Sequence, residues 1–174
     1  MSYFNSEWRT ALAGLLLVTG CGFSSETGSH NAPRQQTTTK QKEKAGMKEI
    51  SGQFDVEISP TESDDPQLGM MILNKTYRGS LDAKGAGRML TGMTDVKGSA
   101  GYVAIEKVTG SLDGAKGSFI IQHFGVQQGE AKRLNIEIIP DSGTEELAGI
   151  EGNMQIDITD EGHMYRLFYR LPRD

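Results

Sequence analysis

Cysteine is almost missing from this chain of 174 residues, and its scarcity excludes two kinds of architecture. The single cysteine, Cys21, cannot form an internal disulfide framework or a cysteine-based zinc site. Histidine is also scarce, with His30, His123 and His163 as its three occurrences, so a histidine-rich metal cluster is not expected. We therefore predict no bound metal and no cofactor, and the position of Cys21 needs an explanation of its own.

Basic charge is a second shortage. The chain has 18 lysine and arginine residues against 23 aspartate and glutamate residues, which gives a net charge of −5. The segment 21–46 holds four basic and two acidic side chains, so the rest of the chain is more acidic still. Because affinity for nucleic acids rests largely on clustered lysine and arginine, nucleic acid is not an expected partner.

Familiar catalytic motifs are absent as well. No glycine-rich phosphate loop precedes a helix, and neither a Gly-x-Ser-x-Gly elbow nor a His-Glu-x-x-His pair occurs. Ser99 and Ser142 lie beside glycines but have no base in their sequence context, which leaves serine hydrolysis unsupported. Any enzymatic function would have to come from residues that folding brings together.

The N-terminal segment has the layout of a secretory signal peptide. An uncharged apolar run at 11–18 follows Arg9 and is too short to cross a bilayer. It leads into Leu17-Val18-Thr19-Gly20-Cys21, which resembles the lipobox of bacterial lipoproteins. This resemblance implies cleavage before Cys21, followed by acylation of its thiol and amine. The alternative is an ordinary cysteine beside a short core segment.

Composition divides the chain into three parts. Residues 1–20 are the expected signal peptide, residues 21–46 a flexible tether of polar side chains, and residues 47–174 one soluble domain. Several acyl chains on Cys21 would hold the domain firmly at a membrane. We therefore expect a lipid-anchored protein of the bacterial cell envelope, at the outer membrane or cell surface, with its domain outside the cytoplasm.

Period-two alternation of apolar and polar residues begins at Ile50. Apolar side chains at 50, 54, 56 and 58 alternate with polar ones, which predicts a strand with one buried face. Seven further runs predict strands, at 68–77, 88–93, 101–108, 118–126, 133–139, 152–158 and 164–171. Turn-forming pairs separate the runs, among them Lys84-Gly85, Asp113-Gly114, Gln128-Gly129 and Glu161-Gly162. The sequence predicts an all-β fold, an eight-stranded antiparallel meander closed into a calycin-like β-barrel, with a two-sheet sandwich as the alternative.

Three blocks of sequence carry a resemblance to a known family. They are 97–106 (KGSAGYVAIE), 117–123 (GSFIIQH) and 140–149 (PDSGTEELAG), and together they resemble the bacterial family of domain of unknown function 3224. The resemblance covers 68–171 and implies an eight-stranded barrel of the allene-oxide-cyclase type. It implies a fold and no particular activity. Members often carry Gly-Arg where this chain has Ala115-Lys116, and lysine lacks the planar fork of arginine.

Tyr102, Glu106 and His123 are the candidate catalytic residues. A turn at Asp113-Gly114 pairs positions whose numbers sum to 227 or 229, and both registers place the three on one face of a hairpin. The 229 register puts Glu106 directly opposite His123, close enough to orient its imidazole. Inside a barrel the three would form a general acid/base site, whereas on the outer wall they would be an exposed cross-strand pair. The opposite face is also apolar, so alternation leaves both possibilities open.

Other polar residues are not assigned a role. His30 lies in the tether and His163 beside a predicted turn, so both are expected to be solvated. Arg166 and Arg170 share a face of the last strand, where we expect them to pair with surface carboxylates.

Three functions follow as hypotheses. The first is a non-catalytic barrel that binds a small apolar or amphipathic molecule, helped by methionine side chains in its interior. The second is a cyclase or isomerase acting on a lipid-like substrate, with Glu106 and His123 as acid and base and Tyr102 as orienting donor. The third is an interaction module of the envelope, with a filled barrel and a functional outer wall. Binding is preferred to catalysis, and the oligomeric state is left open.

Overall fold

The structure, a computed structural model, describes residues 46–159 and 162–172. Within these ranges the chain forms strands and one short 3₁₀ helix, η1. In chain order they are β1 (Lys48–Pro60), β2 (Leu68–Gly79), β3 (Leu81–Met93), β4 (Ser99–Leu112), β5 (Ala115–Gln128), β6 (Ala131–Ile138), η1 (Glu145–Leu147), β7 (Glu151–Thr159) and β8 (Gly162–Arg170). No helix in the described ranges is long and apolar enough to cross a membrane.

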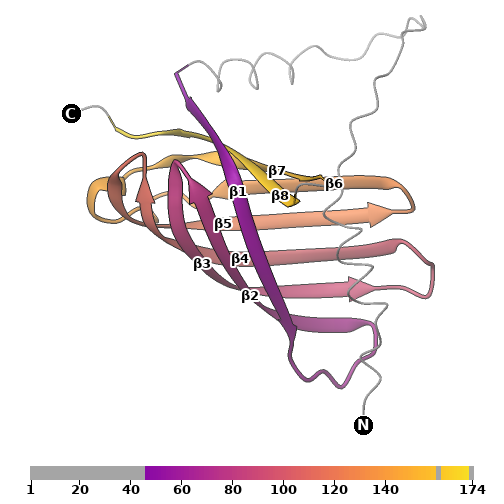
Figure 1. Cartoon of the computed structure of the whole chain (residues 1–174). Coiled ribbons are helices and arrows are strands. Elements are labelled where there is room, and N and C mark those ends of the chain that lie inside the picture. Colours follow the sequence, from indigo (N-terminus) through magenta and orange to yellow (C-terminus); the bar gives the residue numbers. More distant parts are fainter. Residues whose placement is uncertain (1–45, 160–161, 173–174) are drawn as a thin grey trace, which may run out of the picture.

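The strands form one antiparallel meander that closes on itself. Each strand pairs with the next along the chain, and β1 pairs with β8 to complete a barrel. Figure 1 shows β2 to β5 as a broad curved sheet, with β1 crossing over to meet β8. The predicted all-β fold and the eight-stranded antiparallel barrel are confirmed, and the two-sheet sandwich is wrong.

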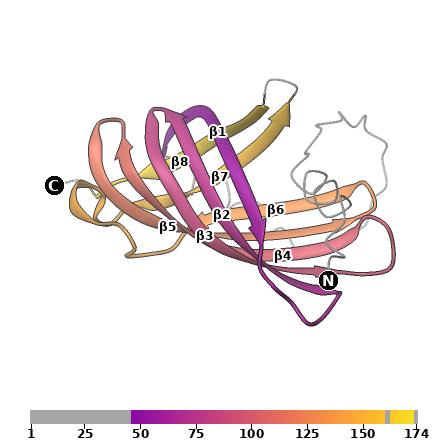
Figure 2. The same ribbon diagram turned by 60° about the horizontal axis from the view of Figure 1, so that its bottom comes forward.

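Pairing around the barrel is uneven. β4 is paired along its whole length with both β3 and β5. In contrast, β6 and β7 share one registered pair in the described chain, Glu137 with Asn153. Figure 2 shows β7 and β8 running away from β6 toward one end of the barrel. We call this end, which carries the loops 61–67 and 94–98, the open end, and the opposite end, which carries η1, the closed end.

The larger hydrophobic cluster fills the closed end. Its fully buried side chains come from several strands and from η1, and include Tyr77, Leu81, Leu112, Phe119, Leu147, Ile150, Tyr165 and Leu167. A smaller cluster lies toward the open end and contains Met71, Leu73, Met89, Tyr102 and Ala104. Since each fully buried large apolar side chain contributes roughly 1.5–3 kcal/mol, the closed end is the more strongly stabilised part.

One predicted turn is in the wrong place. Lys84-Gly85 lies inside β3, and the chain reverses instead at Gly79, whose φ of 110° few other residues adopt. The predicted turn at Asp113-Gly114 is confirmed, with φ of 49° and 89°. Left-handed angles at both positions are those of a type I′ hairpin turn.

Candidate functional site

The two-residue turn between β4 and β5 sets the register of this hairpin. Paired positions sum to 227, so His123 lies opposite Ala104 and not opposite Glu106. The 229 register is wrong because it needs a longer turn. Glu106 and His123 are nevertheless diagonal neighbours on the same face, a separation that long side chains can span.

The hairpin face that carries Tyr102, Glu106 and His123 points into the barrel. All three side chains are buried, and Glu106 is 0% exposed. Side chains of the opposite face are exposed, as Val103 shows at 46%. The alternative of an exposed pair on the outer wall is therefore wrong, and all three candidates lie in the interior.

Lys75 was not a predicted site residue, yet it lies beside Glu106 inside the barrel. Its Nζ donates to Glu106 Oε2 at 2.8 Å and lies 3.3 Å from the hydroxyl of Tyr77. Tyr77 donates its hydroxyl proton to Glu106 Oε1 at 2.7 Å, and His123 Nε2 lies 3.1 Å from Oε2. We call Lys75, Tyr77, Glu106 and His123 the internal polar cluster. Its carboxylate is held by three partners.

Glycines in β3 make room for this cluster. Lys75 pairs with Gly85, and Glu106 pairs with Gly87 on the other side of β3. No β3 side chain therefore stands between the lysine of β2 and the glutamate of β4. A Cβ added to Gly85 would collide with Glu106 Oε1. Glycine in a strand interior often marks such a close approach.

The charges in the cluster follow from burial and from its neighbours. Burial disfavours the ionised form of Glu106, but the Lys75 ammonium and the hydrogen bond from His123 outweigh it and lower its pKa to about 2. Burial lowers the pKa of His123 below 6.5, although the bond to Glu106 opposes this shift. At neutral pH the cluster combines a carboxylate, an ammonium and a neutral imidazole, so it carries no net charge.

One nitrogen of His123 has no hydrogen-bond partner among the described residues. Because an ionised carboxylate can only accept, neutral His123 donates through Nε2 and keeps Nδ1 as an acceptor. Nδ1 makes no hydrogen bond within the described residues, yet every solvent-sealed side-chain nitrogen or oxygen there has a partner. Nδ1 is therefore not sealed. The same reasoning applies to the hydroxyl of Tyr102, which makes no hydrogen bond in the described chain.

Tyr102 lies nearer to the open end than the internal polar cluster. Its ring covers Gly125 of β5, where a Cβ would overlap the ring. Burial, and then the charge of Glu106, raises the pKa of its hydroxyl well above the usual value. Tyr102 is therefore a neutral proton donor whose hydroxyl has no partner among the described residues. It packs with Met71 and Met89 in the smaller cluster.

Aromatic rings lie on the other side of Lys75. Its Nζ is 5.0 Å from the centre of the Phe54 ring, a cation–π distance. His163 stacks on Phe54 with ring centres 5.1 Å apart and is half-buried within β8. The expectation of a solvated turn residue is wrong for His163, because β8 begins at Gly162 and turns this side chain inward. Burial, and then the charge of Lys75, lowers its pKa.

Apolar side chains that point inward near the open end are only half-buried. They are Val56 and Ile58 of β1, Leu134 of β6 and Ile158 of β7. Val56, Leu134 and Ile158 pack against the larger cluster, and Ile58 and Leu134 against the smaller one that contains Tyr102. Apolar walls with a few converging polar atoms are typical of small-molecule sites. In the described ranges, no three His, Cys, Asp or Glu side chains are grouped so that they could hold a metal ion.

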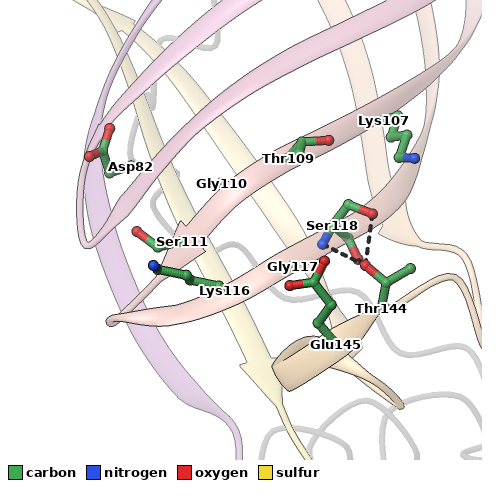
Figure 3. Close-up of a pocket in the computed structure, with 10 residues that line it drawn as sticks. All are labelled: Asp82, Lys107, Thr109, Gly110, Ser111, Lys116, Gly117, Ser118, Thr144 and Glu145. Atoms are coloured by element: carbon green, nitrogen blue, oxygen red, sulfur yellow. Dashed lines mark hydrogen bonds between the residues drawn. The ribbon is translucent and has the colours of Figure 1, made fainter.

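A concavity lies on the outer wall near the closed end (Figure 3). Its volume is about 640 Å³, and it is lined by Asp82, Lys107, Thr109, Gly110, Ser111, Lys116, Gly117, Ser118, Thr144 and Glu145. The hydroxyls of Ser118 and Thr144 are 3.0 Å apart and join two of the three blocks named above. Lys116 is exposed at this rim and makes no ion pair with the described residues.

The remaining predicted residues fall into two groups. Arg166 and Arg170 are exposed and pair with the surface carboxylates of Asp157 and Glu151, as expected. The lipobox with Cys21, the signal peptide and His30 lie outside the described residues. Methionines are divided between interior and surface, since Met71, Met89 and Met154 are buried whereas Met70 is exposed.

Comparison with known proteins identifies the family. The model of the proteins of unknown function DUF3224 matches residues 50–169. The chain belongs to this family. A crystal structure of a DUF3224 protein of unknown function from Shewanella oneidensis MR-1 is 43% identical, with a TM-score of 0.70 over 74% of this chain and 99% of that one. No curated protein matches. The resemblance carried by the three blocks is confirmed, and the match begins before the first of them.

Proposed function

We propose that this DUF3224 barrel binds a small apolar or amphipathic molecule at its open end. The observation that carries the proposal is a pair of polar atoms on inward-facing side chains, His123 Nδ1 and the Tyr102 hydroxyl, that make no hydrogen bond within the described residues. Half-buried apolar side chains, such as Ile58 and Leu134, lie at the same end. A ligand that covered them would gain roughly 25 cal/mol for each Å² of apolar surface removed from water.

The two accessible polar atoms define the polar group of the ligand. His123 offers an acceptor and Tyr102 a donor, and the cluster beneath them carries no net charge. Transferring an ion to such a place would be costly without a counter-charge. A neutral group that both donates and accepts, such as a hydroxyl or an un-ionised carboxylic acid, fits this pair best.

Binding fits the geometry better than catalysis. Glu106 is held by three partners and stays ionised, so its carboxylate is not free to exchange protons with a substrate. The cyclase or isomerase alternative would have to use His123 Nδ1 as its base and Tyr102 as its donor. It therefore shares the ligand site and differs in turnover, which product analysis of a bound ligand would reveal.

Purification from the natural host tests the ligand proposal. We expect native mass spectrometry of the chain to show a co-purifying small molecule that Tyr102→Phe loses and Tyr165→Phe retains. Tyr165 is the matched control, because its inward hydroxyl is bonded to the backbone of Arg78 and Leu81. Circular dichroism would establish that both variants are folded. An empty wild-type protein, or equal ligand content in both variants, would contradict the proposal.

We also propose that the barrel is anchored to a membrane of the bacterial envelope through acylated Cys21. The support is the lipobox-like segment 17–21 and the polar tether 21–46 that follows it. Growth of the host with an alkyne-tagged fatty acid would label the wild-type chain and leave Cys21→Ser unlabelled. Equal labelling of the wild type and Cys21→Ser would contradict the proposed anchor without affecting the proposed ligand site.

A further inference from the structure

An apolar row crosses the outer wall of the barrel near the open end. Its members are partners in register across four consecutive strands: Met70, Leu90, Val103 and Phe124. These side chains are 40% to 57% exposed, and we call them the outer row. Leu68 and Ile105, which are also exposed, extend it on either side. The outer wall thus presents a continuous apolar surface to its surroundings.

The outer row differs from the rest of the outer wall. On β1, for comparison, the outward side chains are polar: Ser51, Gln53, Asp55, Glu57 and Ser59. An antiparallel sheet that packs on one face normally presents polar side chains on the other. Apolar side chains gathered in one row, rather than scattered singly, favour a contact surface.

The surface beside the outer row is open. Next to Leu90 and Val103, the paired residues Gly92 and Gly101 carry no side chains. A Cβ on Gly92 would meet nothing within 4 Å. A second sheet can therefore approach to the usual separation of about 10 Å, and its side chains can pack over these two glycines.

A second copy of this chain offers a sheet that matches. A two-fold axis parallel to the strands, passing between β3 and β4, places Leu90 of one copy opposite Val103 of the other. The same axis places Met70 opposite Phe124. Every member of the outer row then faces another member across the interface. Such self-complementary, two-fold contacts are the commonest way in which soluble proteins associate.

The charges beside the outer row are compatible with this arrangement. Arg88 lies beside the row, and the axis places it opposite Ile105 of the other copy. Lys107 is the next outward residue of β4 after Ile105, and the axis places it opposite Ala86 of the other copy. No like charges meet. An anionic lipid surface fits less well, because the chain has a net charge of −5.

We infer that two copies of this chain associate face to face through the outer row. Four strands and three positions along them span roughly 400 Å² per copy, given strand spacings of about 4.8 Å and about 6.8 Å between same-face residues. The total area that two such faces bury is smaller than that of a standard specific interface. The dimer is therefore weak, with a Kd on the order of micromolar or above.

Sedimentation velocity of the barrel from residue 46 onward tests the inference. The Shewanella oneidensis relative, 99% of which is covered by the match, shows that such a barrel folds by itself. We expect a monomer–dimer equilibrium for the wild type over roughly 1–500 μM, and a monomer for Val103→Glu. Val96→Glu is the matched control, because Val96 is exposed in the loop 94–98. If Val103→Glu does not fold, Val103→Ser takes its place.

An exchange of charges tests the geometry of the interface. Val103→Glu and Leu90→Lys should each abolish self-association, and an equimolar mixture should restore a dimer, because the axis places these positions opposite each other. Three results would overturn the inference: a monomeric wild type, a dimer that survives Val103→Glu, or a mixture without rescue. Flotation of the wild type, but not of Val103→Glu, with phosphatidylcholine vesicles would assign the row to a lipid surface instead.

Discussion

At the scale of single residues, Glu106 organises the interior of the barrel. Its carboxylate accepts hydrogen bonds from Lys75, Tyr77 and His123, and it neutralises the lysine. A buried ion pair adds little net stability compared with an apolar pair, but removing one partner leaves an uncompensated charge. The pair therefore holds the lysine in a definite place at the floor of the proposed ligand site.

Replacing either partner of this pair should destabilise the barrel strongly. We expect Glu106→Gln to lower the free energy of unfolding by about 3–5 kcal/mol, since Lys75 is left buried without a counter-charge. Lys75→Met should cost a similar amount, and the double variant should lose clearly less than the sum of the two. Urea denaturation measures all three. Strictly additive losses would refute a direct interaction.

Acid should weaken the barrel through the same carboxylate. The pKa of Glu106 is about 2 in the folded state, against an ordinary value of 4.5. The stability that this difference provides, about 3 kcal/mol, is complete above pH 4.5 and is lost as the pH falls toward 2. Urea midpoints measured against pH should show this loss in the wild type. Glu106→Gln, which cannot titrate, is the control and should lack it.

His123 adds a second loss of stability on acidification, which begins at a higher pH than the loss caused by Glu106. Because its folded pKa lies below 6.5, the unfolded chain takes up the proton first, and stability declines as the pH drops below about 6.5. His163 has a lowered pKa as well, so each histidine needs its own variant. His123→Gln and His163→Gln should each flatten part of this decline. An unchanged profile in His123→Gln would contradict a neutral, buried imidazole.

Hairpin arithmetic could place Tyr102, Glu106 and His123 on one face, but it could not tell which face is inside. The reason is the outer row, whose apolar side chains make the outside resemble a core. Lys75 was missed because lysine in a strand usually faces solvent. Its position between Leu73 and Tyr77 in the alternation was the available signal.

At the scale of the elements, β3 shows where the sequence pattern fails. The predicted strand at 88–93 covers only the second half of β3. In the first half the inward positions include Ala83, Gly85 and Gly87, which are too small to produce a visible apolar alternation. That half is the part that makes room for the internal polar cluster. The same small side chains therefore hid the strand and created the site.

Two glycines of β3 should respond differently to the same substitution. We expect Gly85→Ala to lower the free energy of unfolding by about 2 kcal/mol or more, because its methyl group collides with Glu106. Gly92→Ala is the control on the same strand, and its effect should stay within about 0.5 kcal/mol, since nothing lies within 4 Å of the new Cβ. Thermal or urea unfolding compares them. Equal effects would argue against the tight packing at Gly85.

Hydrogen exchange should reveal the loose seam between β6 and β7. These strands share one registered pair, Glu137 with Asn153, whereas β4 is paired along its length on both sides. We expect the β6 amides that point away from β5 to exchange faster than those of β4, because open backbone groups are the least protected. Uniform protection across β4 and β6 would show that the barrel is closed there as tightly as elsewhere.

At the scale of the whole molecule, the barrel holds a large hydrophobic cluster toward one end and a smaller one toward the other. Counting strands from the sequence predicted eight of them and their order, and the family resemblance predicted the same barrel. Closure itself, through the pairing of β1 with β8, has no local sequence signal, because the two strands are separated by most of the chain. The sparse pairing between β6 and β7 had no sequence signal either, since both strands have ordinary alternation.

A crystal structure of the barrel purified from its own host is the measurement that tests the central claim most directly. We predict electron density for a small molecule at the open end, with a polar atom within hydrogen-bond distance of Tyr102 or His123 Nδ1. The apolar part of this molecule should cover Ile58 and Leu134. An open end that contains only water, or protein side chains packed against both polar atoms, would contradict the account.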